Sequence, residues 1–330
     1  MTRNIGQRLR LGLGVLLVLT CVDEAAGHFK FFSTENDVYR VELIRWERYG
    51  PGYDGVRFLL LVREKGTAAE RVVLIENPTT GLEEAEIVDD TLILFGEVQS
   101  RARSVTLVNL ASGQVRDFFR HWGVALSPSR RFLVFRAFYP PHGMVEVRSD
   151  VVRVYDIARS PAENRITGAR EAVPGAYVGL PIYPPENVAP PTYRVWVPEE
   201  TQRHYVDPTA GFLWTPDEKS LFFIDKTGGQ TRLVRVSLEE GGRQPQIGTM
   251  PIDVAPVIAI EPQSPEYPKA LARTRGGLAV IGLKLESDGR ITLKLDPDLY
   301  RRKVYSVTEL TVAPPEAAAP GEAAVEESPR

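Results

Sequence analysis

The chain has 330 residues, 43% of them hydrophobic and 25% charged, a composition typical of a folded protein and unlike that of a disordered one. The formal net charge of −3 and the sequence pI of about 6.0 argue against a nucleic-acid partner. The 27 glycines and 26 prolines indicate many turns, and the length permits one large all-β domain or two ordinary domains.

Residues 1–27 have the pattern of a signal peptide. Three arginines precede a short apolar run at 11–22, and small residues at 25–27 offer a cleavage site. The run is shorter than the roughly 20 residues that a membrane-spanning helix needs, so we expect no transmembrane helix in the mature chain. Export to the periplasm or the extracellular space is therefore predicted, and an uncleaved N-terminal anchor is the alternative.

Cys21 is the one cysteine of the chain, and it lies within this segment. The sequence VLTC at 18–21 loosely resembles a bacterial lipoprotein box, so lipidation at Cys21 is a second possibility. If cleavage follows Gly27, the mature chain has no cysteine. Its stability then has to come from its core and not from disulfides.

Short runs typical of strands, separated by turn residues, begin near Phe29. Some alternate between apolar and polar residues and others are continuously apolar, as half-buried and buried strands are. They lie at 38–46, 56–62, 71–75, 92–95 and 104–110. Helical periodicity with capping residues is nearly absent here. The pattern predicts an all-β fold.

Two ten-residue segments align with each other without gaps. LSPSRRFLVF begins at 126 and WTPDEKSLFF at 214, a separation of 88 residues (126 to 214). Each contains a hydroxyl residue, a proline, a polar turn and an apolar strand. Two units of about 44 residues suit four-stranded propeller blades. Weaker copies end at Gly81 and Gly113, and this uneven spacing leaves the number of blades open.

These segments resemble the Ser-Pro-Asp-Gly-Lys strand motif of TolB-type, WD-like β-propeller repeats. Arg130 and Glu218 stand where the motif has glycine. The resemblance implies a degenerate β-propeller over residues 28–260, in which stacked meanders bury faces that one meander alone leaves exposed. It implies no particular activity, because such propellers serve many functions.

Residues 261–312 are expected to form a separate C-terminal segment. It contains a possible helix at 268–275 and a hairpin whose strands lie at 278–285 and 290–295. The stretch 265–296 also resembles the start of the C-terminal domain of TonB-type transducers, through a Tyr-Pro, a Gly and an Asp-Gly. The Ala-rich helix that should follow in that family is missing. The segment is either a ring-closing blade or a small module of its own.

The acidic, Ala/Pro-rich tail at 313–330 has little to bury and is predicted to be disordered.

Motifs for catalysis and metal binding are not found in the sequence. It has no Gly-x-Ser-x-Gly elbow, no paired histidine ligands, no calcium loop and no phosphate-binding glycine loop. No catalytic residue, metal ligand or cofactor is therefore predicted. His121 is expected to pack within the aromatic cluster at 118–122.

A Pro/Tyr-rich region at 169–198 is predicted to be an irregular connection between blades, and it is also a candidate binding loop. The candidate binding residues are aromatic residues of this region and two histidines expected on loops: His142, Tyr177, Tyr183, Tyr193, Trp196 and His204.

The sequence is thus interpreted as that of an exported, non-catalytic propeller that binds a protein or another component of the bacterial cell envelope. One alternative is a propeller-type hydrolase or lactonase with a central metal or acid/base site gathered from several blades. The other is a TonB-like envelope adaptor that uses residues 265–296. The oligomeric state is left open.

Overall fold

The computed structural model divides into two compact units, residues 1–118 and 119–330. It describes residues 31–47, 56–77, 81–97, 103–137, 151–165, 178–183, 206–227, 230–238, 245–252, 263–265, 278–301 and 307–316. The predicted signal peptide with Cys21 and most of the predicted tail lie outside these residues. Within them, no helix is both long enough and apolar enough to cross a bilayer.

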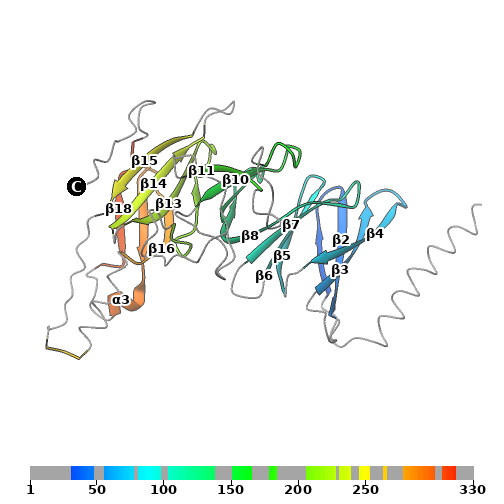
Figure 1. Cartoon of the computed structure of the whole chain (residues 1–330), viewed down its shortest axis with the longest axis horizontal. Helices are drawn as coiled ribbons and strands as arrows, with labels where there is room; N and C mark the ends of the chain where they lie inside the picture. The colour runs from blue at the N-terminus through cyan, green and yellow to red at the C-terminus, as the bar shows by residue number, and fades with distance from the viewer. Residues whose placement is uncertain are drawn as a thin grey trace, which may run out of the picture. The chain divides into compact units, whose positions relative to one another are not determined.

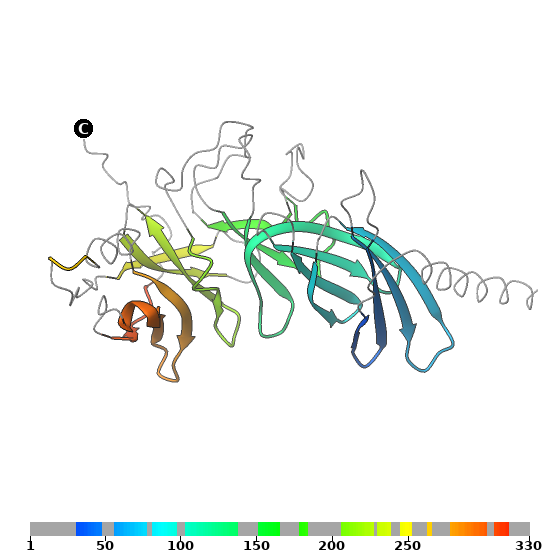
Figure 2. The same ribbon diagram turned by 90° about the horizontal axis from the view of Figure 1, so that it is seen from below.

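The described chain is all-β, as predicted. Its strands form antiparallel sheets of four, seven, four and three strands, and within each sheet neighbours in sequence are neighbours in space. Figure 1 and Figure 2 show these up-and-down meanders in succession along the chain. The one helix among the described residues is the short α3 (Pro297–Arg301). Four-stranded meanders are the building units that a degenerate propeller requires.

Unit 1 begins with a sheet in the order β1-β2-β3-β4. Its strands are β1 (Phe31–Glu35), β2 (Tyr39–Glu47), β3 (Val56–Glu64) and β4 (Glu70–Asn77). One face packs on strands β5 to β7 through a core whose buried members are aliphatic, with Phe32 and Tyr39 partly buried against it, which fits the alternating pattern of the sequence. The buried members of this core are Val41, Leu43, Leu60, Val62, Val73, Ile75, Ala85, Ile87, Leu92, Leu94, Val108 and Leu110.

The seven-stranded sheet has the order β11-β10-β9-β8-β7-β6-β5. Its strands are β5 (Gly81–Val88), β6 (Thr91–Glu97), β7 (Arg103–Asn109), β8 (Gln114–Leu126), β9 (Phe132–Ala137), β10 (Val152–Asp156) and β11 (Leu180–Tyr183). The boundary between the two units falls within the 13-residue strand β8. Strand β11 lies at the edge of this sheet and contains Pro181. Proline has no N–H to donate to a neighbouring strand, and an edge strand tolerates this because one of its sides is unpaired.

Unit 2 also contains the meander β12-β13-β14-β15. Its strands are β12 (Leu213–Trp214), β13 (Ser220–Thr227), β14 (Gln230–Ser237) and β15 (Gln246–Pro251). Leu221 and Phe223 of β13 pack in one core with β9, β10 and β11, whereas Phe222 and Ile224 pack in another with β16 and β17. Because both faces of β13 are buried, its sequence contains a continuous apolar run at 221–224.

The predicted C-terminal hairpin is present. Strands β16 (Val280–Leu285) and β17 (Ile291–Leu295) are joined by a turn in which Gly289 has a φ of 83°, and β18 (Glu309–Val312) is the third strand. The apolar face of this sheet shares a core with β13 and β14. These strands therefore belong to unit 2. The possible helix at 268–275 lies outside the described residues.

Candidate functional site

The turn between β8 and β9 is closed by backbone hydrogen bonds and by one hydroxyl. The N–H of Ser127 donates to the carbonyl of Phe132 at 2.8 Å, and the N–H of Arg130 donates to the carbonyl of Ser127 at 2.8 Å. The hydroxyl oxygen of Ser127 accepts from the N–H of Phe132 at 3.1 Å. The hydroxyl group of Ser127 therefore adds a hydrogen bond that helps to close the turn.

The turn between β12 and β13 repeats these contacts. The N–H of Thr215 donates to the carbonyl of Ser220 at 2.9 Å, and the N–H of Glu218 donates to the carbonyl of Thr215 at 2.9 Å. The hydroxyl oxygen of Thr215 accepts from the N–H of Ser220 at 3.0 Å. Asp217 bonds within its own turn, since its carboxylate accepts from the N–H of Lys219 at 3.1 Å. The two segments that align in sequence are thus equivalent in structure.

Arg130 and Glu218 occupy left-handed backbone conformations, with φ values of 65° and 59°. These are the two positions at which the propeller-repeat motif has glycine. A side chain in this region is disfavoured by sterics, and glycine is not. The two aligned turns therefore share a left-handed conformation at this position although neither has glycine there.

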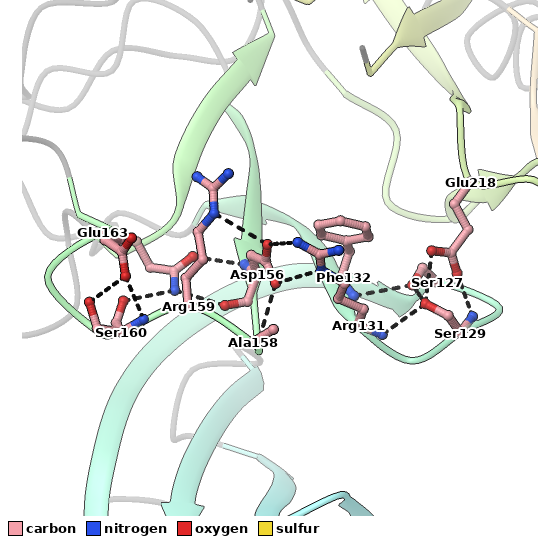
Figure 3. Close-up of polar contacts among 11 residues, drawn as sticks. Ser127, Ser129, Arg131, Phe132, Asp156, Ala158, Arg159, Ser160, Glu163 and Glu218 are labelled. Carbon is pink, nitrogen blue, oxygen red and sulfur yellow. Dashed lines mark hydrogen bonds and ion pairs between the residues drawn. The ribbon is translucent and has the colours of Figure 1, made fainter. Parts of the chain in front are cut away.

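The two repeat turns also contact each other, as Figure 3 shows. The carboxylate of Glu218 accepts hydrogen bonds from the backbone N–H of Ser129 and, at 2.8 Å, from the hydroxyl of Ser129. Partial burial acts to raise the pKa of Glu218. The bonds from Ser129, together with Ser127 and the positive charge of Arg131, outweigh that effect and hold the pKa below its usual value of 4.5.

Asp156, at the end of β10, organises the neighbouring part of this cluster (Figure 3). Arg131 donates to both of its carboxylate oxygens, at 3.1 and 2.8 Å, and Arg159 forms an ion pair with it at 3.4 Å. Asn164 bonds both the N–H and the carbonyl of Asp156, at 2.7 and 2.8 Å. These hydroxyls and carboxylates fasten turns together. They are not arranged as a nucleophile with a base.

The opposite end of these strands, which we call the loop end, is marked by Ala137 of β9, Val151 beside β10 and Tyr183 of β11. Val152 of β10 pairs with Arg136 on one side and with Tyr183 on the other. The segments 138–150 and 184–205 both leave the described residues from this end. Segment 184–205 returns at Val206, whose backbone bridges to Asp225 of β13.

Polar side chains are buried just beneath the loop end. The hydroxyl of Tyr183 donates to the carboxylate of Asp225 at 2.5 Å, and the two side chains come from different sheets. Asp225 is completely buried. On the other face of β13, Lys226 forms an ion pair with Asp207 at 2.8 Å. A short bond to a buried carboxylate is among the stronger hydrogen bonds in proteins, so these contacts fix the relative position of β11 and β13.

Of the six candidate binding residues, Tyr183 lies within the described part of the chain. It is not on an irregular loop, as the sequence suggested, but ends strand β11 with only 2% of its surface exposed. Its ring packs edge-on against Phe223, with 5.1 Å between centroids. Tyr183 is therefore a core residue. The other five lie outside the described residues: His142, Tyr177, Tyr193, Trp196 and His204.

His121 packs within the aromatic cluster that was predicted around it. It is 1% exposed, and its ring centroid lies 6.4 Å from that of Phe119. Among the described residues, no group of three or more His, Cys, Asp or Glu side chains is placed to hold a metal ion.

The sequence reasoning missed Asp225. It stands at the end of the apolar run LFFI in β13. The alternation of a strand places residues 221, 223 and 225 on one face, and this could have identified it as a buried carboxylate.

Comparison with protein-family models and with curated proteins gives no match for this chain. Among solved structures, it is similar to a chain from a structural and mechanistic study of two prolyl endopeptidases, with 13% sequence identity and a TM-score of 0.34. The similarity covers 89% of this chain and 36% of that chain. This chain therefore corresponds to about a third of the length of the matched protein, and neither a family nor an activity is assigned from the similarity.

Proposed function

We propose that this protein is an exported, non-catalytic binding or scaffold protein of the bacterial cell envelope, and that it meets its partner at the loop end of unit 2. The observation that carries the proposal is the register across β9, β10 and β11. Because Arg136, Val152 and Tyr183 are direct neighbours, the segments 138–150 and 184–205 start from one end of these three strands. Together they contain His142, Tyr193, Trp196 and His204.

The contrast between the two ends of the strands supports this choice. At the other end, which we call the turn end, residues 127–131 and 215–219 make tight turns closed by their own hydrogen bonds and joined to each other by the contact of Ser129 with Glu218. At the loop end, long segments rich in tyrosine, tryptophan and proline are joined to rigid strands. Binding residues commonly lie on loops held by a rigid scaffold, and large amphipathic aromatics often dominate the binding energy.

The buried contacts beneath the loop end give it the rigidity that a binding surface needs. The bond between Tyr183 and Asp225 connects β11 to β13, and the ion pair between Asp207 and Lys226 holds the returning chain to β13. Groups fixed in advance lose less conformational freedom on binding. Export is supported by the signal-like pattern of residues 1–27.

Site-specific photo-cross-linking in intact bacterial cells tests the proposal. A photo-reactive phenylalanine analogue is placed at Tyr193, Trp196 or His204 at the loop end, and at Arg130 or Asp217 at the turn end as matched controls. We expect a discrete cross-linked species from the loop-end positions and none from the controls. The N-terminus of the purified protein, read by mass spectrometry, is expected to be His28.

Each other outcome counts against the proposal in a distinct way. Cross-links from the turn end alone would move the binding surface to the paired turns. Cross-links from Asp288, in the hairpin of the segment that resembles TonB-type domains, would favour the adaptor alternative. An N-terminus at Met1 in the cytoplasmic fraction would contradict export.

A further inference from the structure

The hairpin that joins β16 to β17 turns at an exposed Asp-Gly pair, Asp288 and Gly289. Two backbone hydrogen bonds close this turn. The N–H of Gly289 donates to the carbonyl of Glu286 at 3.0 Å, and the N–H of Glu286 donates to the carbonyl of Arg290 at 2.9 Å. A Cβ at Gly289 would meet nothing within 4 Å, so its φ of 83°, and not a lack of space, is what favours glycine after Asp288.

An aspartate followed by glycine can isomerise, because glycine has no side chain to hinder ring closure. In this reaction the backbone nitrogen of Gly289 attacks Cγ of Asp288 in its carboxylic acid form. A bond forms between N and Cγ, and the O–H of the carboxyl group leaves with the amide proton as water. Water then opens the cyclic imide at either carbonyl, which restores aspartate or leaves the backbone running through Cγ as isoaspartate. The reaction therefore needs nothing except water.

Arg290 holds the carboxylate of Asp288 with both its backbone and its side chain. The backbone N–H of Arg290 donates to Oδ1 at 3.0 Å, and its Nε donates to Oδ2 at 2.7 Å. These bonds, the one from the backbone foremost, hold the pKa of Asp288 below its usual value of 3.8. The side chain of Asp288 thus stays ionised. A carboxylate loses oxygen to an attacking amide much less readily than a carboxylic acid does.

We propose that Asp288 is a site of isoaspartate formation and that the side chain of Arg290 suppresses the reaction there. The geometry opposes ring closure at both reacting groups. Both carboxylate oxygens are bonded to Arg290, so turning Cγ toward the nitrogen of Gly289 breaks these bonds. The proton that the nitrogen must lose is donated to the carbonyl of Glu286. Each bond that has to be broken adds to the barrier.

The same turn sets the register of strands that belong to the core of unit 2. Leu285 pairs with Ile291 and Leu283 pairs with Leu293. Ile291 and Leu293 are completely buried in the core that these strands share with β13 and β14. Isoaspartate adds a backbone carbon inside the turn, so the two closing hydrogen bonds cannot both keep their geometry. Isomerisation would therefore loosen the hairpin, and Arg290 protects this core from chemical ageing.

Prolonged incubation of the purified full chain at neutral pH tests the inference. Mass spectrometry with electron-transfer fragmentation distinguishes isoaspartate from aspartate of equal mass in peptides that contain residue 288. We expect Arg290→Ala to form isoaspartate about two- to fivefold faster than the wild type, the range for loss of a solvent-exposed ion pair. Arg290→Lys keeps a cation and is expected to recover part of the protection. Asp288→Glu cannot close the same ring, so it verifies the assignment.

The chain provides an internal control in a second Asp-Gly pair, Asp54-Gly55, which lies outside the described residues. A substitution at Arg290 is expected to leave the rate at Asp54 unchanged. Salt separates a charge effect from a general loosening of the hairpin. Because the ion pair is exposed to solvent, high salt is expected to speed the reaction at Asp288 in the wild type and not in Arg290→Ala.

Four results would overturn the inference. They are equal rates at Asp288 in the wild type and Arg290→Ala, no isoaspartate at Asp288 in either protein, an equal acceleration at Asp54, and a salt effect of the same size in both proteins. Circular dichroism identifies any variant that fails to fold. The inference does not depend on a partner at the loop end, so none of these results affects the proposed function.

Discussion

The carboxylate of Glu218 accepts hydrogen bonds from both the backbone N–H and the hydroxyl of Ser129, 89 residues earlier in the chain. Each residue lies in the tight turn of one of the two repeats. The contact joins the equivalent turns of two blade-like meanders, and Glu218 occupies the position at which the repeat motif has glycine. Glu218 at this position thus forms a bond between the two turns.

The variant Glu218→Gln is expected to lower the free energy of unfolding by about 1 kcal/mol at pH 7, because an amide cannot accept both bonds from Ser129 as well as a carboxylate does. The pKa of Glu218 is lowered in the folded state. Its contribution is therefore fully present above the usual pKa of 4.5 and is lost as the pH falls through the lower folded-state value. Urea unfolding at pH 7 and below pH 4 measures this difference, and one that stays constant would contradict the assignment.

The variant Arg130→Gly is expected to be neutral or to stabilise the protein by about 0.5 kcal/mol. The left-handed backbone conformation of Arg130 costs a residue with a side chain roughly 1–2 kcal/mol, and glycine avoids this cost. Glycine also increases the entropy of the unfolded chain, which offsets part of the gain. The variant Ser129→Gly, in the same turn, removes the hydroxyl bonded to Glu218 and serves as the contrasting control. Thermal unfolding should separate the two, and a loss of stability in Arg130→Gly would contradict this prediction.

The variant Tyr183→Phe is expected to lower the free energy of unfolding by about 1–3 kcal/mol. It keeps the packing against Phe223 but removes a hydrogen bond from the fully buried carboxylate of Asp225. Urea unfolding monitored by fluorescence measures this change. The matched variant Tyr39→Phe, at a partly buried tyrosine of unit 1, is expected to have little effect. Equal effects at both positions would show that the Tyr183–Asp225 bond contributes nothing particular.

Gly179 and Gly211 make a matched pair for backbone strain, with φ values of 81° and 71°. A Cβ at Gly179 would lie 2.8 Å from the ring of Phe135, which is itself stacked on Phe119 at 4.2 Å. A Cβ at Gly211 would meet nothing within 4 Å. Gly211→Ala is therefore expected to cost about 1 kcal/mol and Gly179→Ala about 3 kcal/mol or more. Similar unfolding midpoints for the two variants would disprove the clash.

Much of the fold could be predicted from local sequence patterns. Alternation and apolar runs identified most strands of unit 1, and the aligned segments at 126 and 214 identified two turns whose hydrogen bonds prove equivalent. The Ser-Asp-Gly hairpin near 288 was also correctly predicted. These features depend on contacts between residues close in sequence, which is why one sequence suffices to predict them.

The partners of these elements could not be predicted in the same way. Tyr183 was expected on an exposed loop because its surroundings are rich in proline, yet it is buried in β11 and bonded to Asp225, 42 residues later. The core that β16 and β17 share with β13 likewise could not be predicted from composition alone. Burial depends on which distant face packs on a residue, and no local pattern contains that information.

For this protein, the sequence by itself determined the class of fold and the two repeat turns, because turn chemistry and side-chain alternation act over a few residues. Only the tertiary structure decided that Glu218 bonds to Ser129, that Tyr183 is a core residue, and that segments 138–150 and 184–205 share one end of the strands. Those facts follow from the register between strands and from the stacking of one sheet on the next. Register and stacking are selected by the total free energy of many contacts between residues far apart in the sequence.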